Sequence, residues 1–484
     1  MPISSLPSPY GIGTFGKAAY QYADFLKAAG QKYWQLLPLG PTSYGDSPYQ
    51  SFSTFAGNPY FIDLDLLIKD GLLKKKEVTA CQWGDNPRYV DYGKVFESRF
   101  PLLEKAKERG WERDREEVRA FEKENERWLA DYALFMALKR HFNMAAWGDW
   151  PDEDIRLHKK EAVESWRRKL SGDVELFIYI QFLFFKQWSA LKEYINHLGI
   201  RIIGDLPIYV AMDSADVWAE PDKFLLDEHG VPAAVSGVPP DYFSEDGQLW
   251  GNPLYDYETM AKTGFEWWIR RIGGAQKLYD VIRIDHFRGF ESFWAVPYGE
   301  KTARKGKWIK GPGMSLVGVL TGWFHDLEFI AEDLGYPTPE VEQLLADSKL
   351  PGMKVLEFAF NPHEPSNYLP HFYKENCICY TGTHDNAPLA EWLEEGDPKE
   401  LAHARKYLGL NEEEGIIRGL IRGGMGSVAK LFVAQMQDYL ELGKYNRMNT
   451  PGTAKGNWEW RMLPGEASKK LAKQIGEMTR LYGR

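Results

Sequence analysis

The stretch VIRIDHFRG, residues 281–289, decides the fold class, because a near-continuous apolar run ends abruptly at the acidic residue Asp285. Runs without polar alternation are typical of parallel strands that are covered on both faces of a sheet. Helical patterns separate further runs of this kind: QKYWQLLPLG (31–40), IRIIGDLPIYV (200–210), FIAEDLG (329–335), MKVLEFAF (353–360) and CICYTGTHD (377–385). This alternation predicts an α/β fold, the (β/α)8 TIM barrel, whose chemistry lies at the C-terminal strand ends.

The uneven spacing of these runs predicts one catalytic barrel domain, residues 1–484, with large and mostly helical insertions. A charged segment at 67–172 predicts a helical insertion subdomain. A second insertion, 213–257, predicts a lid region that contains a Pro/Gly-rich loop at 235–253, because loops this long usually cover or line a site. We expect no separate C-terminal β-domain. A doubly wound open sheet is the competing layout, but the chain lacks the glycine fingerprint of a dinucleotide site.

Charge and cysteine content narrow the classes of partner and compartment. The formal net charge of −10 argues against nucleic acid and anionic membranes, which attract positive surfaces. Three cysteines, Cys81, Cys377 and Cys379, provide no disulfide framework and predict a cytoplasmic protein. The last two alternate in an apolar run, so we expect both to face one side of a buried strand. The 18 tryptophans suit stacking against sugar rings, although a tryptophan-rich core explains them equally well.

Three acidic residues follow predicted strands, namely Asp285, Glu332 and Asp385, which we place on barrel strands 4, 5 and 7. The carboxyl ends of barrel strands meet at one face, so these side chains are expected to converge. Cleavage of a glycosidic bond requires an acid with a raised pKa and a carboxylate that supports the anomeric carbon. A single acid after a strand can instead cap the next helix, and that structural role is the alternative for each residue.

At these carboxylates the sequence resembles the 4-α-glucanotransferases of glycoside hydrolase family 77, also called amylomaltases or disproportionating enzymes. The resemblance covers nearly the whole chain. Its motifs are SSLPSPYGIGTFG (4–16), GDSPYQSFSTFAGNPYFIDL (45–64), GDLPIYVAMDSADVWA (204–219), GVPPDYFSEDGQLWGNPLY (237–255), RIDHFRG (283–289), IAEDLG (330–335), TGTHDN (381–386) and NTPGT…NWEWR (449–461).

The resemblance implies a retaining double displacement through a covalent glucosyl-enzyme, with no cofactor and no metal. Asp285 is then the nucleophile, Glu332 the general acid/base, and Asp385 the third carboxylate, which steadies the distorted sugar. The reaction implied is transfer of α-1,4-glucan segments to the 4-hydroxyl of glucose or a maltooligosaccharide.

The resemblance also implies a set of substrate-binding side chains: Tyr49, Asp205, Tyr242, Trp250, Arg283, His286, His384 and Asn449. Arg283 lies two positions before Asp285 on the same strand face and can hold that carboxylate ionised. The two histidines can donate hydrogen bonds to sugar hydroxyls, with neutral packing as the alternative. Neither histidine belongs to a metal-ligand spacing.

One departure from the family concerns the N-terminus. The resemblance implies a first barrel strand before SLPSPYGIG, whereas only residues 1–5 precede Leu6 here. The chain is either truncated or numbered from a downstream Met, and in both cases we expect strand 1 to be short.

Two other functions compete with transfer. An α-glucan hydrolase would use the same carboxylates with water as acceptor. A glycan-binding protein without catalysis is the third hypothesis, and the costly cluster of three acids argues against it.

Overall fold

The computed structural model describes residues 1–484 except 44, 241–243, 336–337 and 364–365. Two arcs of parallel strands lie at its centre. The first has the order β1 (Tyr33–Gln35), β2 (Arg201–Leu206), β5 (Val281–Ile284) and β8 (Glu328–Ala331). The second has the order β11 (Leu431–Val433), β10 (Cys377–Tyr380) and β9 (Gly352–Val355). Every pairing within the two arcs is parallel, which confirms the α/β class of the prediction.

The arcs approach each other between β8 and β9, where the Ala331 N–H donates to the Pro351 carbonyl at 2.9 Å. Within the described residues, no ladder joins β11 to β1. The N-terminal residues lie against β1 without forming a strand: Trp34 Nε1 donates to the Met1 carbonyl at 2.7 Å. The strand β11 was missing from the sequence prediction, because a three-residue run such as LFV carries no periodic signal.

The strand period of two sends alternate side chains into the barrel. An inner cluster collects them: Ile203, Val281, Ile330, Met353, Val355, Ile378 and Tyr380. Cys377 and Cys379 lie on the other face of β10 with Tyr373, so the prediction that both face one side is confirmed. The inward side of the same alternation includes Asp205 within β2, and Asp285 and Glu332 directly after β5 and β8.

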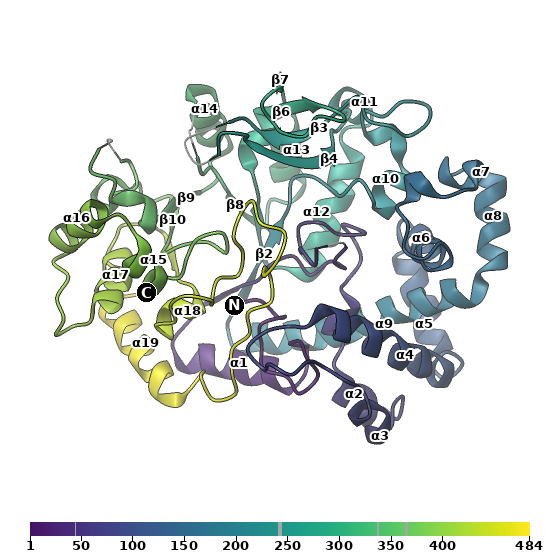
Figure 1. Ribbon diagram of the computed structural model, residues 1–484, viewed down its shortest axis with the longest axis horizontal. Coiled ribbons are helices and arrows are strands. Elements are labelled where there is room, and N and C mark those ends of the chain that lie inside the picture. The colour runs from purple at the N-terminus through teal and green to yellow at the C-terminus, as the bar shows by residue number, and fades with distance from the viewer. Residues whose placement is uncertain (44, 241–243, 336–337, 364–365) are drawn as a thin grey trace.

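Helices surround the strands, as Figure 1 shows. They include α1 (Lys17–Ala28), α9 (Ser171–His197), α12 (Glu266–Leu278), α13 (Met314–Trp323), α14 (Pro339–Ser348), α17 (Ile416–Met425) and α19 (Lys469–Leu481). The 27-residue α9 is followed by Gly199 at φ +79°, a left-handed position that suits glycine. No helix of the described residues is long and apolar enough to span a membrane.

A group of helices lies to one side of the strands in Figure 1. It comprises α2 (Leu64–Lys69), α3 (Lys75–Thr79), α4 (Tyr92–Gly110), α5 (Arg115–Glu124), α6 (Leu129–His141), α7 (Glu153–Arg156) and α8 (Lys160–Lys169). Helix α6 packs against α9 and buries Leu129, Tyr132, Phe135 and Met136. The charged residues of this segment therefore flank a buried apolar face, as their helical spacing indicates. Shorter helices complete the fold: α10 (Ala215–Ala219), α11 (Tyr257–Lys262), α15 (Leu389–Glu395), α16 (Pro398–Leu408) and α18 (Met436–Tyr439).

The prediction that residues 235–253 form a loop is wrong, because most of this segment forms strands. It contains most of β3 (Ala234–Val238) and all of β4 (Gln248–Pro253). With β6 (Ser292–Pro297) and β7 (Lys307–Lys310) these form an antiparallel sheet in the order β4-β3-β6-β7. The partner strand β6 lies more than 50 residues further along the chain. Its pairing with β3 is a long-range contact that the composition of the segment does not reveal.

Gly204 in β2 permits the close approach of the ring of Tyr279. A Cβ at Gly204 would lie 2.0 Å from that ring, and the Tyr279 hydroxyl accepts a hydrogen bond from the Leu39 N–H at 3.0 Å.

Gly204→Ala should therefore destabilise the fold by about 1–3 kcal/mol, because overpacking forces Tyr279 to move. The thermal unfolding midpoint at a fixed scan rate measures this. Gly273→Ala in α12 is the control, since its Cβ would meet Phe324 at 3.9 Å. Equal midpoints for both variants would contradict the prediction.

Candidate active site

The backbone fixes two of the predicted carboxylates at adjacent strand ends. The Asp285 N–H donates to the Leu206 carbonyl and the Glu332 N–H donates to the Ile284 carbonyl, each at 3.0 Å. These bonds extend the parallel ladders one residue beyond β5 and β8. The convergence expected of neighbouring strand ends is therefore built into the sheet itself.

Arg283 lies between two carboxylates inside the barrel. Its Nη1 is 2.6 and 2.7 Å from the oxygens of Asp205 and 3.0 Å from Asp285 Oδ1. The side chains of Arg283 and Asp205 are 4% and 1% exposed. The Tyr49 hydroxyl also donates to Asp205, at 2.7 Å. Both oxygens of Asp205 thus have protein partners, so in this structure Asp205 orients Arg283 and Tyr49.

The protonation of the site is set by burial and by neighbouring charge. Burial raises the pKa of Asp285, while the Arg283 guanidinium opposes the rise and the charges of Asp205 and Glu332 add to it. Burial also raises the pKa of Glu332, against the effect of Arg283 and of two backbone N–H groups. Arg283 therefore acts in the predicted direction, but desolvation outweighs it. The two acids titrate as a coupled pair.

His286 holds Glu332 through an unusual backbone conformation. It adopts φ 53° and ψ 47°, a left-handed geometry that is uncommon for residues other than glycine. In this conformation its N–H donates to Glu332 Oε2 at 2.8 Å, and the Leu334 N–H donates to Oε1 at 2.8 Å. Burial lowers the pKa of His286 to about 3, so its imidazole is neutral. The ring can offer a sugar hydroxyl one N–H donor or one acceptor.

An aromatic cluster forms beside the Arg283 group. The Tyr49 ring stacks on His384 with centroids 5.0 Å apart and planes inclined by 24°, and its hydroxyl is 3.3 Å from His384 Nδ1. Trp458 packs against both rings, at 5.6 Å and 5.7 Å. Trp458 was absent from the predicted site residues, although it belongs to the NWEWR motif quoted for the family resemblance.

Asp385 lies at the open side of the site, with 47% of its side chain exposed. Asn449 Nδ2 donates to Asp385 Oδ1 at 2.6 Å, and His384 Nε2 is 3.4 Å from the same oxygen. Arg447 Nη2 donates to the Asp385 backbone carbonyl at 2.9 Å. The structure therefore brings Asn449 and His384 to the third carboxylate. It adds Arg447, whose position next to the Asn449 motif was the available sequence signal.

The antiparallel sheet contributes Trp250 from β4. Its ring meets His286 edge to face at 4.8 Å and lies 6.3 Å from the ring of Tyr209, which follows β2. This places one predicted aromatic against the catalytic strand ends. Tyr242, the other predicted aromatic of this segment, and its neighbour Phe243 lie outside the described residues.

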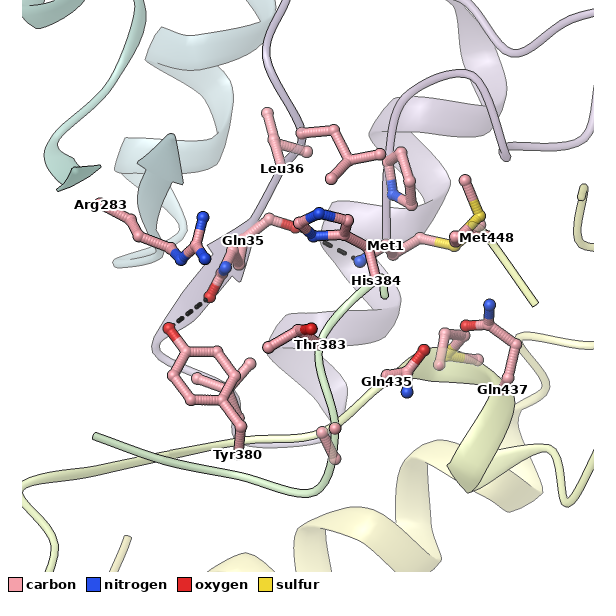
Figure 2. Close-up of a pocket in the computed structure, with 16 residues that line it drawn as sticks. Met1, Gln35, Leu36, Arg283, Tyr380, Thr383, His384, Gln435, Gln437 and Met448 are labelled. Atoms are coloured by element: carbon pink, nitrogen blue, oxygen red, sulfur yellow. Dashed lines mark hydrogen bonds between the residues drawn. The ribbon is translucent and has the colours of Figure 1, made fainter. Parts of the chain in front are cut away.

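A cavity opens beside the ion cluster, as Figure 2 shows. Its walls include Gln35, Arg283, Tyr380, Thr383, His384 and Gln435. The Tyr380 hydroxyl donates to Gln35 Oε1 at 3.0 Å across its floor. In the part of the chain that the structure describes, no three His, Cys, Asp or Glu side chains group as metal ligands.

Removal of the Arg283 charge should destabilise the fold in a pH-dependent manner. Arg283→Met leaves Asp205 and Asp285 buried without their cation, a loss expected to cost about 3–5 kcal/mol. Because burial raises the pKa of folded Asp285 above its unfolded value, ionisation opposes folding as the pH rises through that range. The loss of stability of Arg283→Met relative to the parent should therefore be larger at pH 8 than at pH 5. Thermal unfolding midpoints of both proteins at the two pH values measure this loss. Arg283→Met with Asp205→Asn is the control and should recover part of the loss. A pH-independent deficit would contradict this account.

Comparisons with known proteins identify the family of the chain. The sequence model of a family described as 4-alpha-glucanotransferase matches residues 1–466. The 4-alpha-glucanotransferase of Clostridium butyricum is 51% identical over 100% of both chains. That of Thermus thermophilus is 46% identical over 98% of this chain and 96% of its own. The structure of an amylomaltase from Streptococcus agalactiae in complex with acarbose has a TM-score of 0.98 at 43% identity, covering 100% of this chain and 98% of the other. The resemblance inferred from the sequence motifs is thus confirmed, and the chain belongs to the 4-alpha-glucanotransferase family.

Proposed function

We propose that Asp285, Glu332 and Asp385 carry out a retaining transfer of α-1,4-glucan segments to the 4-hydroxyl of glucose or a maltooligosaccharide. The observation that carries the proposal is the unequal environment of two neighbouring acids. Asp285 touches the Arg283 guanidinium at 3.0 Å, whereas Glu332 is held by two backbone N–H groups. An ionic partner favours the carboxylate form more strongly than neutral donors do. Burial raises the pKa of both acids, that of Asp285 to about 7, and on the ground of these contacts we assign the proton of the pair to Glu332.

In the first step, Asp285 attacks the anomeric carbon and forms a glucosyl ester. The glycosidic bond breaks at the same time, and Glu332 transfers its proton to the departing 4-oxygen of the released sugar. Asp385, held by Asn449 at 2.6 Å, accepts hydrogen bonds from hydroxyls of the distorted glucose. The raised pKa of Glu332 suits the acid in this step, because a group must be protonated at neutral pH to donate.

In the second step, the 4-hydroxyl of an acceptor sugar attacks the anomeric carbon of the ester. Glu332, now ionised, removes the hydroxyl proton, and the ester bond to Asp285 breaks to restore both carboxyl groups. Two displacements at the same carbon retain the α configuration. The pair returns to its starting protonation, with the proton again on Glu332.

Water competes with the sugar acceptor at ~55 M, so transfer requires a positioned acceptor, whose effective molarity can reach about 10⁵ M. Trp250, against His286 and Tyr209, offers an aromatic surface at the catalytic strand ends. This favours transfer over the hydrolase alternative. The acceptors and donors proposed are α-1,4-glucans, maltooligosaccharides and glucose. The three free cysteines suit the proposed cytoplasmic location.

The two acids should be distinguishable by a donor whose leaving group needs no proton, such as an α-maltooligosyl fluoride. Asp285→Asn should abolish formation of the glycosyl-enzyme from every donor, detected as added sugar mass on the intact protein. Glu332→Gln should lose most activity on maltotriose but still release fluoride and trap the sugar. Asp326→Asn, on the surface, is the matched control. Indistinguishable behaviour of the two variants with the fluoride would refute the assignment.

Trp250→Ala should lower transfer more than hydrolysis, because a poorly held acceptor loses to water. Both rates can be measured in one incubation with maltotriose. Hydrolysis increases the number of reducing ends, whereas transfer conserves that number and is measured from the longer oligomers that it forms. We expect the hydrolytic fraction to rise about tenfold, a change of about 1.4 kcal/mol between the two barriers. Trp323→Ala, a 66% exposed tryptophan on α13, is the control. A proportional fall of both rates would show that Trp250 does not select sugar over water.

A further inference from the structure

Glu357 is a buried acid that the mechanism above does not use. It lies in the short 3-10 helix Leu356–Ala359, directly after β9, and only 8% of its surface is exposed. Strand β9 lies in the barrel between the strands that precede Glu332 and Asp385. In this position the Glu357 carboxyl lies against Gly382, in the loop that follows β10 (Cys377–Tyr380).

Glu357 lies against the loop that carries Asp385. Its carboxyl and the Asn386 side chain meet at Gly382, where a Cβ would lie 2.7 Å from Glu357 Oε1 and 2.9 Å from Asn386 Cβ. Asn386 Oδ1 in turn accepts from the Thr383 N–H at 2.9 Å and from Thr383 Oγ1 at 3.0 Å. The Asp385 N–H donates to Thr383 Oγ1 at 3.3 Å. The Glu357 carboxyl therefore lies next to Asn386, and hydrogen bonds through Thr383 connect Asn386 to the backbone of the third acid.

The start of the same loop rests directly on Glu357. The Glu357 N–H donates to the Thr381 carbonyl at 3.3 Å. The absence of a side chain at Gly382 lets the loop approach the Glu357 carboxyl closely. Glu357 thus contacts the loop at its first residues and, through Asn386, at its last.

We propose that Glu357 is a positioning residue for Asp385, which holds residues 381–386 in place through Asn386, Thr383 and the backbone at Gly382. The proposal rests on the catalytic role proposed for Asp385. None of the predicted site residues follows β9, so the proposal adds a residue from this strand end to the site.

The charges that face Glu357 favour a neutral carboxyl. Asp438 of α18 and Glu391 of α15 bring negative charge, and the positive charge of Arg447 opposes them. Among the described residues, Glu357 Oε1 is buried and has no hydrogen-bond partner. Burial raises the pKa of Glu357 well above its usual range, in the same direction as the two acids. Ionisation at alkaline pH would place an uncompensated charge beneath Gly382 and disturb the loop.

The test compares Glu357→Gln, which keeps shape, polarity and neutrality, with Glu357→Leu, which removes the carboxyl group. With maltotriose as substrate, we expect kcat of Glu357→Leu to fall about ten- to a hundredfold with little change in KM, because a displaced catalytic group weakens transition-state contacts. Glu357→Gln should stay within about threefold of the parent, and its alkaline limb of activity should move to higher pH. Asn386→Ala leaves the buried acid in place and should cause a similar loss of kcat. This variant carries the test if Glu357→Leu fails to fold.

Combination with Asp385→Asn separates positioning from general support of the fold. If Glu357 acts through Asp385, adding Glu357→Leu to Asp385→Asn should cause no further loss of kcat. Losses that multiply, or parental kcat in both Glu357→Leu and Asn386→Ala, would overturn the proposal. Parental activity of Asp385→Asn alone would instead overturn the catalytic role of Asp385, a failure distinct from that of the positioning proposal.

Discussion

One buried guanidinium between two carboxylates is the interaction on which the site depends. Asp205 and Arg283 are direct partners across the parallel ladder of β2 and β5, and Asp285 follows Arg283 by two residues on the same face. A register shift of one residue would turn these side chains out of the barrel. The positive charge of Arg283 offsets part of the desolvation cost of burying two acids, and Tyr49 joins the cluster through a hydrogen bond to Asp205.

Around this cluster, the site is assembled from strand ends and from backbone groups that point inward. Glu332 has its two oxygens held by the N–H groups of His286 and Leu334, so its orientation depends on the left-handed conformation of His286. Such strained residues persist where the surrounding structure over-determines them, and they gather at functional sites. On the opposite side, Asp385 is more exposed and depends on Asn449 and on its own loop. Asp285 and Glu332 are therefore held by Arg283 and by backbone groups at the strand ends, whereas Asp385 relies on contacts from loops.

The sequence predicted the strands that carry chemistry, and it missed elements whose signal is short or non-local. The runs at 281–284, 328–331 and 377–380 form strands, because continuous apolar residues are what a covered parallel strand requires. Strand β11 consists of only three residues and has no detectable period. Strands β3 and β4 looked like a loop, since their Pro/Gly-rich surroundings conceal a pairing with β6. Trp458 and Arg447 contact His384 and Asp385 from a C-terminal segment. Local sequence patterns do not reveal that this segment returns to the barrel.

By itself, the sequence determined the class of fold and the family, and it predicted the three carboxylates, because each acid is marked by the apolar strand before it and by its motif. Only the tertiary structure decided how these groups behave. It pairs Asp205 with Arg283 across 78 residues of chain and lets burial outweigh that pairing in the pKa of Asp285. It also seats the Asp385 loop on Glu357. The physical reason is that motifs record which side chains are present, whereas desolvation and charge coupling depend on distances between residues far apart in the chain.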